Sequence, residues 1–160
     1  MSAFNIRDAT LSDVPVLARL IAAFRDHLNA KVPTGSDIQA HLPRALRDPG
    51  IEFACAWIND EAVGYTQTRF LTSVWAAGLE AYLEDLFVVS VARRQSVGRS
   101  LLGHVLARAK ARGALKLSLT TNDRNESAHS LYRSEGFAPV SHALYPGGCE
   151  VLWSRRVGAA

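Results

Sequence analysis

The chain has 160 residues, of which 48% are hydrophobic and 21% charged, and its formal net charge is +3. These values fit one soluble globular domain, and so small a net charge gives no argument for a nucleic-acid partner. No apolar run is long enough to span a bilayer, and the N-terminal segment lacks the basic start and apolar stretch of a signal peptide. We therefore expect a cytoplasmic protein.

Apolar spacing alternates between helical and strand-like periods, which predicts an α/β (α+β) fold in a single domain over residues 1–160. The expected strands are residues 4–9, 51–58, 62–70, 79–89, 115–121, 137–145 and 150–153, and the expected helices are residues 14–24, 37–46, 98–112 and 125–135. A hairpin joins the second and third strands, a loop with Trp75 and Gly78 follows, and the last two strands flank a turn at Pro146–Gly148.

The two cysteines, Cys55 and Cys149, both fall within strand-like segments. We expect small buried apolar side chains in a reducing compartment. The spacing of Cys and His residues matches no zinc site, so no metal is expected. No motif supports a Cys–His nucleophile pair.

The segment Arg93–Ser100 connects the apolar strand end Leu86–Val89 to an apolar helix. The first turn of a helix has backbone N–H groups without intrahelical partners, and the helix dipole favours an anion there. Arg93, Arg94 and Arg99 bracket this turn. The segment therefore predicts a site for a pyrophosphate group.

Two spaced motifs give the chain a resemblance to the GNAT acyltransferase superfamily. The pyrophosphate motif of that family, Arg/Gln-x-x-Gly-x-Gly/Ala, is matched by residues 93–98, with Ser96 in place of the first glycine. A second motif, Asn-x-x-Ala-x-x-Leu-Tyr-x-x-x-Gly-Phe, is complete in residues 125–137. Within the superfamily, the run Tyr82–Val88 resembles the diamine/polyamine acetyltransferase branch.

The resemblance implies a mixed, mostly antiparallel central sheet of about seven strands, with helices on both faces and a splay between the fourth and fifth strands. It also implies acetyl-CoA as co-substrate and a small-molecule amine as acceptor, with no nucleic-acid or membrane partner. Many family members dimerise through their C-terminal strands, so we expect a homodimer. Exposed apolar side chains at Val151, Leu152 and Trp153 would fit such an interface, although a core strand would show the same pattern. The residues expected to bind the coenzyme are Leu86, Phe87, Val88, Arg93, Arg94, Gln95, Ser96, Val97, Gly98, Arg99 and Asn125.

Two of these positions leave alternatives open. A positive φ at Ser96 would weaken the turn, whereas a helical φ would make serine harmless and let its hydroxyl donate to phosphate. We expect the helical φ, because the rest of the turn is intact. Asn125 fits a helix N-cap as well as a coenzyme ligand, and its spacing to Tyr132 favours the ligand role.

Tyr132 and Glu84 are the expected catalytic residues. A tyrosine, with a pKa of about 10, is able to donate to a departing thiolate, and the second motif implies this role for Tyr132. Glu84 is the expected general base, with Asp85 in reserve or holding the substrate ammonium. Because neighbours on a strand point to opposite faces, only one of these carboxylates should face a given side of a cleft. His27 and His129 are alternative bases.

The acceptor pocket is expected to include Arg25, His27, Lys31 and the loop from Phe70 to Trp75. The polyamine branch usually has acidic groups late in its first helix, so the basic residues here argue against a long polyamine. Their mixed charge suits an amine that also bears a carboxylate or another polar group. The alternatives are a protein N-terminus or lysine as acceptor, and a coenzyme-binding module without turnover.

Overall fold

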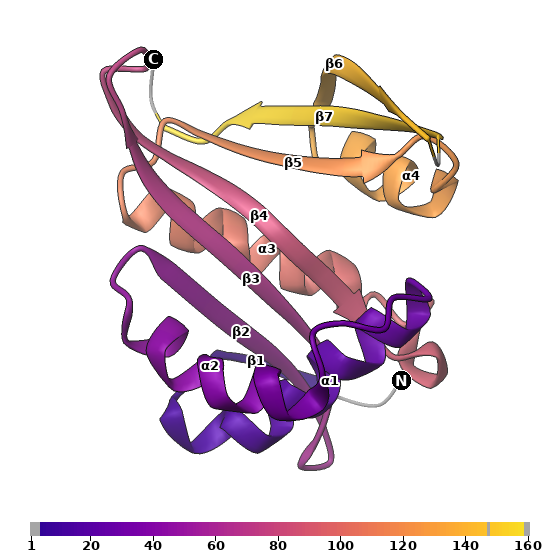
Figure 1. Ribbon diagram of the computed structural model, residues 1–160. Helices are drawn as coiled ribbons and strands as arrows, with labels where there is room; N and C mark the ends of the chain where they lie inside the picture. Colours follow the sequence, from indigo (N-terminus) through magenta and orange to yellow (C-terminus); the bar gives the residue numbers. More distant parts are fainter. Residues whose placement is uncertain (1–3, 147, 159–160) are drawn as a thin grey trace. The chain divides into compact units, whose positions relative to one another are not determined.

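Figure 1 shows the computed structural model, which describes residues 4–146 and 148–158. Within these residues, seven strands form a mixed sheet in the order β1-β2-β3-β4-β5-β7-β6, mostly antiparallel with β4 and β5 parallel. The chain divides into two compact units: an N-terminal unit of Met1–Thr68 and Asp85–Val105, and a C-terminal unit of Arg69–Glu84 and Leu106–Ala160. Residues 1–3, 147, 159 and 160 of the expected domain lie outside the described residues, among them Gly147 of the expected last turn.

The elements follow the order and type expected from the sequence. The strands are β1 (Phe4–Asp8), β2 (Ile51–Ile58), β3 (Glu61–Ser73), β4 (Gly78–Val88), β5 (Lys116–Asn122), β6 (Ala138–Tyr145) and β7 (Gly148–Arg156). The helices are α1 (Val14–His27), α2 (Gly35–Arg47), α3 (Val97–Ala111) and α4 (Glu126–Ser134), with short 3₁₀ helices at Leu11–Asp13 and Ser90–Ala92.

Gly78 differs from the expectation, because it begins β4 instead of lying in a loop. A Cβ at this position would lie 2.8 Å from Cδ1 of Leu115. A larger residue here would make the Leu115 side chain shift, a close approach that local sequence does not distinguish from a turn.

Helices cover both faces of the strands in the N-terminal unit. Cys55 and Ala56 are consecutive, fully buried residues of β2, so their side chains point to opposite faces. Cys55 packs in a core with Leu17 of α1, whereas Ala56 packs in a core with Leu101 of α3. The expected helices on both faces are thus confirmed.

A partly buried ion pair joins the start of α1 to β1. Asp13, only 4% exposed, accepts hydrogen bonds at 2.8 Å from both terminal nitrogens of Arg7 and at 2.7 Å from the backbone N–H of Thr10. Chiefly because of Arg7, the pKa of Asp13 falls from 3.8 to about 2. A depressed carboxyl pKa means that the pair stabilises the fold above the ordinary value and loses this contribution as the pH falls through about 2.

The C-terminal unit is organised by β7, which pairs with β5 on one side and with β6 on the other (Figure 1). Val151 and Trp153 of β7 are 3% and 1% exposed. These two are core residues, in agreement with the core-strand alternative, whereas Leu152 between them is half-buried, and the homodimer stays a prediction. Cys149, expected to be buried, is half-buried near the start of β7.

The parallel pairing of β4 with β5 ends early. It runs from Ala81, opposite Leu117, to Leu83, opposite Leu119, whereas β4 itself continues to Val88. The expected splay between the fourth and fifth strands is confirmed by this end of the register.

Candidate active site

The expected pyrophosphate turn lies between the short helix Ser90–Ala92 and α3. Its backbone is left-handed at Arg94, with φ of 62°, and at Ser96, with φ of 65°. The expectation of a helical φ at Ser96 is therefore wrong: serine occupies a conformation that glycine adopts at lower cost. The Ser96 carbonyl accepts a hydrogen bond from the Ser100 N–H at 3.0 Å, so α3 starts directly after this left-handed residue.

Arg93 and Gln95 brace the turn against the protein. The Nε of Arg93 donates to the Val88 carbonyl at 2.8 Å, and its guanidinium lies 5.8 Å from the centre of the Phe87 ring. The Nε2 of Gln95 donates to the Val91 carbonyl at 3.1 Å. Both side chains thus hold the turn in place through contacts with the chain before it.

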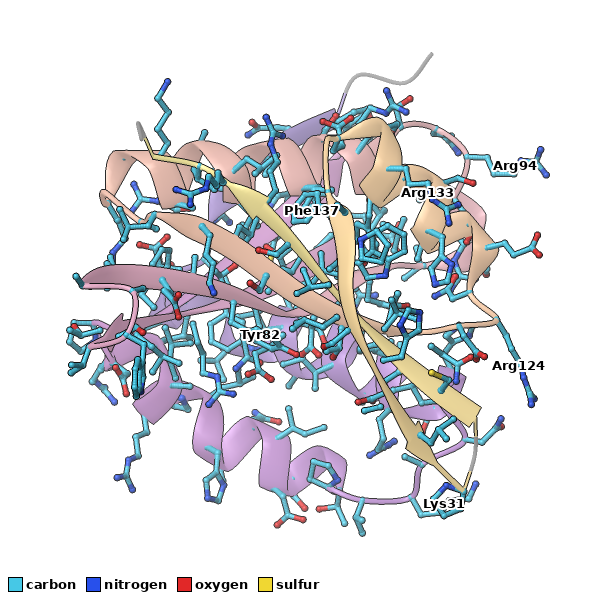
Figure 2. The ribbon with its side chains drawn as sticks, turned by 90° about the horizontal axis from the view of Figure 1, so that it is seen from above. Lys31, Tyr82, Arg94, Arg124, Arg133 and Phe137 are labelled. Carbon is cyan, nitrogen blue, oxygen red and sulfur yellow. The ribbon has the colours of Figure 1, made fainter. Side chains whose placement is uncertain are left out.

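Arg94 is an exposed cation, and Figure 2 shows its side chain extending away from the ribbon. Val97 is 1% exposed and anchors the first turn of α3 in the core, with Gly98 and Arg99 following it. The first backbone N–H groups of a long helix beside an exposed arginine suit a diphosphate.

Asp85 and Phe87, at the end of β4, pack with an aromatic group of the N-terminal unit. The hydroxyl of Tyr65, a fully buried residue of β3, donates to Oδ2 of Asp85 at 3.0 Å. Burial, and then the charge of Asp85, raise the pKa of Tyr65, so this phenol stays protonated. Phe87 stacks on Phe24 of α1 with ring centres 5.2 Å apart. Sequence reasoning missed Tyr65, because it lies in an apolar run typical of a core strand.

Two of the residues expected to bind the acceptor, Arg25 and His27, lie in the last turn of α1 and have local partners in the N-terminal unit. The guanidinium of Arg25 donates to Oδ1 of Asp26 at 2.7 and 2.9 Å and to the Pro33 carbonyl at 2.8 Å. His27 lies with its ring 6.1 Å from that of Phe87, and Lys31 is exposed. Arg25 therefore ties the segment after α1 to the helix, and its contact with a substrate stays a prediction.

A cleft of about 370 Å³ lies within the C-terminal unit. Its lining residues, from β3, β4 and β5, are Arg69, Leu71, Glu80, Ala81, Tyr82, Glu84, Lys116 and Ser118. Glu84, the expected base, forms an ion pair with Arg69, and Glu80 forms one with Lys116 at 2.9 Å. Sequence reasoning missed Arg69 and Glu80, although charged residues at alternate strand positions signal a polar face.

The segment expected as a pocket loop from Phe70 to Trp75 is divided. Phe70 belongs to β3, is 6% exposed, and has the Arg112 guanidinium 3.9 Å from its ring centre. Trp75 lies in the turn after β3 and is fully exposed. Phe70 is thus a packing residue, because β3 extends three residues further than its apolar pattern predicts.

The second motif forms α4 and its two ends. Oδ1 of Asn125 accepts hydrogen bonds from the Ala128 N–H at 3.2 Å and from the Ser127 hydroxyl at 3.1 Å, so the N-cap alternative is confirmed. Tyr132 is 7% exposed, with its ring centre 5.9 Å from Phe137 and 6.3 Å from Trp153. Burial raises the pKa of Tyr132 to about 12.

His129, an alternative base, is held by the same unit. Its Nε2 lies 3.0 Å from the Asn122 carbonyl, and its ring centre lies 5.1 Å from that of Trp153. These contacts anchor α4 to the end of β5 and to β7, which is a structural role.

Metal-binding and membrane-spanning features are absent from the part of the chain that the structure describes. Residues 4–146 and 148–158 contain no group of three or more His, Cys, Asp or Glu side chains placed to hold a metal ion. No helix in these ranges has both the length and the apolar character needed to cross a bilayer.

Burial raises the pKa of Cys55 to about 12, so this thiol is not a nucleophile at neutral pH.

Comparisons with known proteins agree with this geometry. The model of the acetyltransferase (GNAT) family matches residues 18–137. An uncharacterized N-acetyltransferase of Bacillus subtilis is 33% identical over 136 residues, which are 83% of this chain and 89% of that protein. An aminoalkylphosphonate N-acetyltransferase of Salmonella typhimurium is 29% identical over 92 residues, which are 58% of this chain and 60% of that protein. A solved structure described as a probable acetyltransferase has a TM-score of 0.80 at 26% identity, covering 89% of this chain and 97% of its own.

Proposed function

Because the chain belongs to the GNAT family of acetyltransferases, we propose that it transfers the acetyl group of acetyl-CoA to the primary amine of a small molecule. The amine attacks the thioester directly while both substrates are bound. The observation that carries a small acceptor is the cleft of the C-terminal unit, whose volume of about 370 Å³ and four charged side chains suit a compact polar amine.

The N-terminal unit supplies the groups for the coenzyme. Acetyl-CoA provides an activated acetyl group as a thioester. The N–H groups at the start of α3 and the cation of Arg94 bind its diphosphate, and Arg93 keeps the turn in place. The backbone of Leu86–Val88 adds hydrogen bonds to the extended pantetheine arm, as a strand edge does for a peptide. In the C-terminal unit, Asn125 is a further residue proposed to bind the coenzyme, through its side-chain amide.

Glu84 acts as the general base. An amine is protonated at neutral pH and has no lone pair to attack with, so a proton must pass from its nitrogen to a base. The Arg69 guanidinium is the present ion-pair partner of the Glu84 carboxylate, so it competes with the substrate ammonium for that group. The proton therefore passes through a water molecule, or reaches Glu84 after Arg69 has changed partner. Asp85, which accepts a hydrogen bond from Tyr65, is the reserve for the role of base.

Tyr132 assists the departing sulfur. A phenol with a pKa of about 12 is a much weaker acid than a thiol, whose pKa is about 8.5. Complete proton transfer from the phenol to the thiolate is thus unfavourable. Tyr132 instead donates a hydrogen bond to the sulfur as the C–S bond breaks, and the thiolate leaves as an anion.

The test is release of free thiol from acetyl-CoA with a panel of diamines, polyamines, amino acids, aminoglycosides and short peptides. We expect release with small amines. Glu84→Gln is expected to lower kcat by about 100-fold or more and to flatten the acidic limb of the pH–rate profile. Binding of acetyl-CoA, measured by calorimetry, should be unchanged. The matched control is Glu61→Gln, at an exposed position at the start of β3.

Three results would contradict the proposal. Release with peptides alone would identify a protein acetyltransferase. Tight binding of acetyl-CoA with no release from any amine would identify a coenzyme-binding module. An unchanged acidic limb in Glu84→Gln would move the base to Asp85 or to a histidine.

A further inference from the structure

The cleft of the C-terminal unit has an ionic arrangement that bears on the identity of the acceptor. Arg69 of β3 pairs with Glu84 of β4, and Lys116 of β5 pairs with Glu80 of β4. Glu80 and Glu84 share one face of β4 with Tyr82 between them, because residues two and four apart on a strand point the same way. The cleft thus presents two cations and two carboxylates.

We propose that the acceptor is an amine that also carries an anionic group, a carboxylate or a phosphonate, and that Arg69 binds this anion. The inference rests on the proposed function. A cleft with balanced charges is complementary to a zwitterion, whose ammonium is attracted to a carboxylate and whose anion is attracted to a guanidinium. A diamine brings two cations and no anion, so it would add positive charge to a cleft whose carboxylates already pair with Arg69 and Lys116.

Arg69 is better suited than Lys116 to select the anion. A guanidinium presents two parallel N–H groups that match the oxygens of a carboxylate or a phosphonate, whereas an ammonium acts as a point charge. The Arg69 side chain is 47% exposed, so it is able to change partner without unpacking the protein. Its present partner is the proposed base, which connects anion binding to the chemistry.

Binding of the anion by Arg69 would release the Glu84 carboxylate to act as the base. When the substrate anion takes Arg69, the Glu84 carboxylate loses its present partner and is able to contact the ammonium of the same molecule. The proton that it accepts comes from that ammonium, whose nitrogen then forms the new C–N bond as the C–S bond breaks. An amine without the anion would leave Arg69 on Glu84, where it competes with the ammonium for the carboxylate.

The test uses two pairs of amines that differ only in the anion. Cadaverine is lysine without its carboxylate, and ethylamine is 2-aminoethylphosphonate without its phosphonate. Values of kcat/KM are measured by thiol release, and binding of each amine to the coenzyme A complex is measured by calorimetry. We expect the anionic member of at least one pair to be favoured about tenfold or more, the effect of one charge-assisted hydrogen-bonded pair. The pair with the larger preference identifies the anion.

Three variants connect this preference to Arg69. Arg69→Gln is expected to reduce the ratio of kcat/KM values by about tenfold, chiefly through KM of the anionic amine. Arg69→Lys keeps the charge without the fork and should give an intermediate ratio. Arg47→Gln, at an exposed position at the end of α2, removes an arginine elsewhere and should leave the ratio unchanged. Because a half-exposed ion pair contributes little to stability, all three variants should fold.

The outcomes separate this inference from the proposed function. Equal kcat/KM values within both pairs, or a preference that survives in Arg69→Gln, would overturn the inference and leave the acetyltransferase proposal standing. No thiol release from any amine would overturn the proposed function, and the binding data would then decide the inference. Preferential binding of an anionic amine that Arg69→Gln abolishes supports it, and equal binding overturns it.

Discussion

The two motif segments of this chain, residues 93–98 in the N-terminal unit and residues 125–137 in the C-terminal unit, hold their backbones in different ways. The first segment has two left-handed residues, Arg94 and Ser96, and neither is a glycine. The second has its left-handed residue at Gly136, with φ of 80°, where no side chain opposes the conformation. One segment is locally strained and exposed, and the other is relaxed and packed.

This difference indicates what each segment contributes. The turn at residues 93–98 presents backbone N–H groups, so its function depends on how well its conformation is set before an anion binds. The segment at residues 125–137 packs the ring of Tyr132 against Phe137, which is also buried, and against Trp153 of β7, so its function depends on this packing. Changes in the first segment should act on coenzyme affinity, and changes in the second on turnover or stability.

The largest effect is expected at the start of α3, from Gly98→Asp. A carboxylate in the first turn of a helix interacts favourably with the helix dipole, so the variant should fold with an unchanged or higher melting temperature. The same carboxylate competes with and repels the diphosphate, so the affinity for acetyl-CoA should fall by about 100-fold or more. Gly103→Asp is the matched control, because a Cβ at Gly103 has no heavy atom within 4 Å. Normal affinity of Gly98→Asp in calorimetry would refute the diphosphate site.

The next effect is expected at the hydroxyl of the packed segment, from Tyr132→Phe. The ring contacts remain, so the melting temperature and the affinity for acetyl-CoA should change little, whereas kcat should fall by about 10- to 100-fold. A pKa raised to about 12 keeps the phenol protonated throughout the usual assay range, so Tyr132 should cause no alkaline loss of activity below about pH 11. Thiol release measured at a series of pH values gives both kcat and its dependence on pH. An unchanged kcat would remove Tyr132 from the chemistry.

The strands and helices could be predicted from local sequence pattern. The predictions that proved wrong concern contacts or backbone conformations that this pattern does not contain. Apolar periodicity located every strand and α-helix, because burial on one face is written into the spacing of a segment. Gly78 was predicted in a loop, since the close approach of Leu115, distant in the sequence, is not visible in the local pattern. The φ of Ser96 was misjudged, because an intact flanking motif does not reveal the conformation at the substituted position itself.

The residues of the candidate site likewise divide into those that the sequence predicts and those that it does not. Tyr132 and Asn125 follow from a motif of fixed spacing within one helix. Tyr65 and Arg69 do not, because each meets its carboxylate through strand pairing: Tyr65 lies 20 residues before Asp85, and Arg69 pairs with Glu84. Sequence alternation predicts which face of a strand is polar, but the partner across the sheet depends on register.

A smaller effect is expected at the cap of the packed segment, from Asn125→Ala. Loss of the hydrogen bond from the Ala128 N–H should cost about 1 kcal/mol of the free energy of unfolding, measured by denaturant titration. Asn125→Asp keeps the accepting oxygen and should restore the stability. If the amide also donates to the pantetheine arm, Asn125→Asp will retain a KM for acetyl-CoA raised about fivefold, because the carboxylate has no N–H to donate. A normal KM in Asn125→Asp would limit Asn125 to its cap.

The smallest effect is expected in the strained segment, from Ser96→Gly. Glycine adopts a φ of 65° without opposition from a side chain, so the turn should be better set for the diphosphate. Part of this gain is offset because glycine gives the unfolded chain more freedom, so the net stability should change by less than about 1 kcal/mol. The affinity for acetyl-CoA should rise about threefold, since strain of this kind is worth about 1 kcal/mol or less once the turn relaxes.

Ser96→Ala separates the two contributions of serine, because it keeps the backbone strain and removes the hydroxyl. If calorimetry shows that Ser96→Ala binds acetyl-CoA as tightly as the natural chain and that Ser96→Gly binds it more tightly, the backbone conformation limits binding. If both variants bind more weakly, the serine hydroxyl itself contacts the phosphate, and the strain at this turn is the cost of placing that hydroxyl.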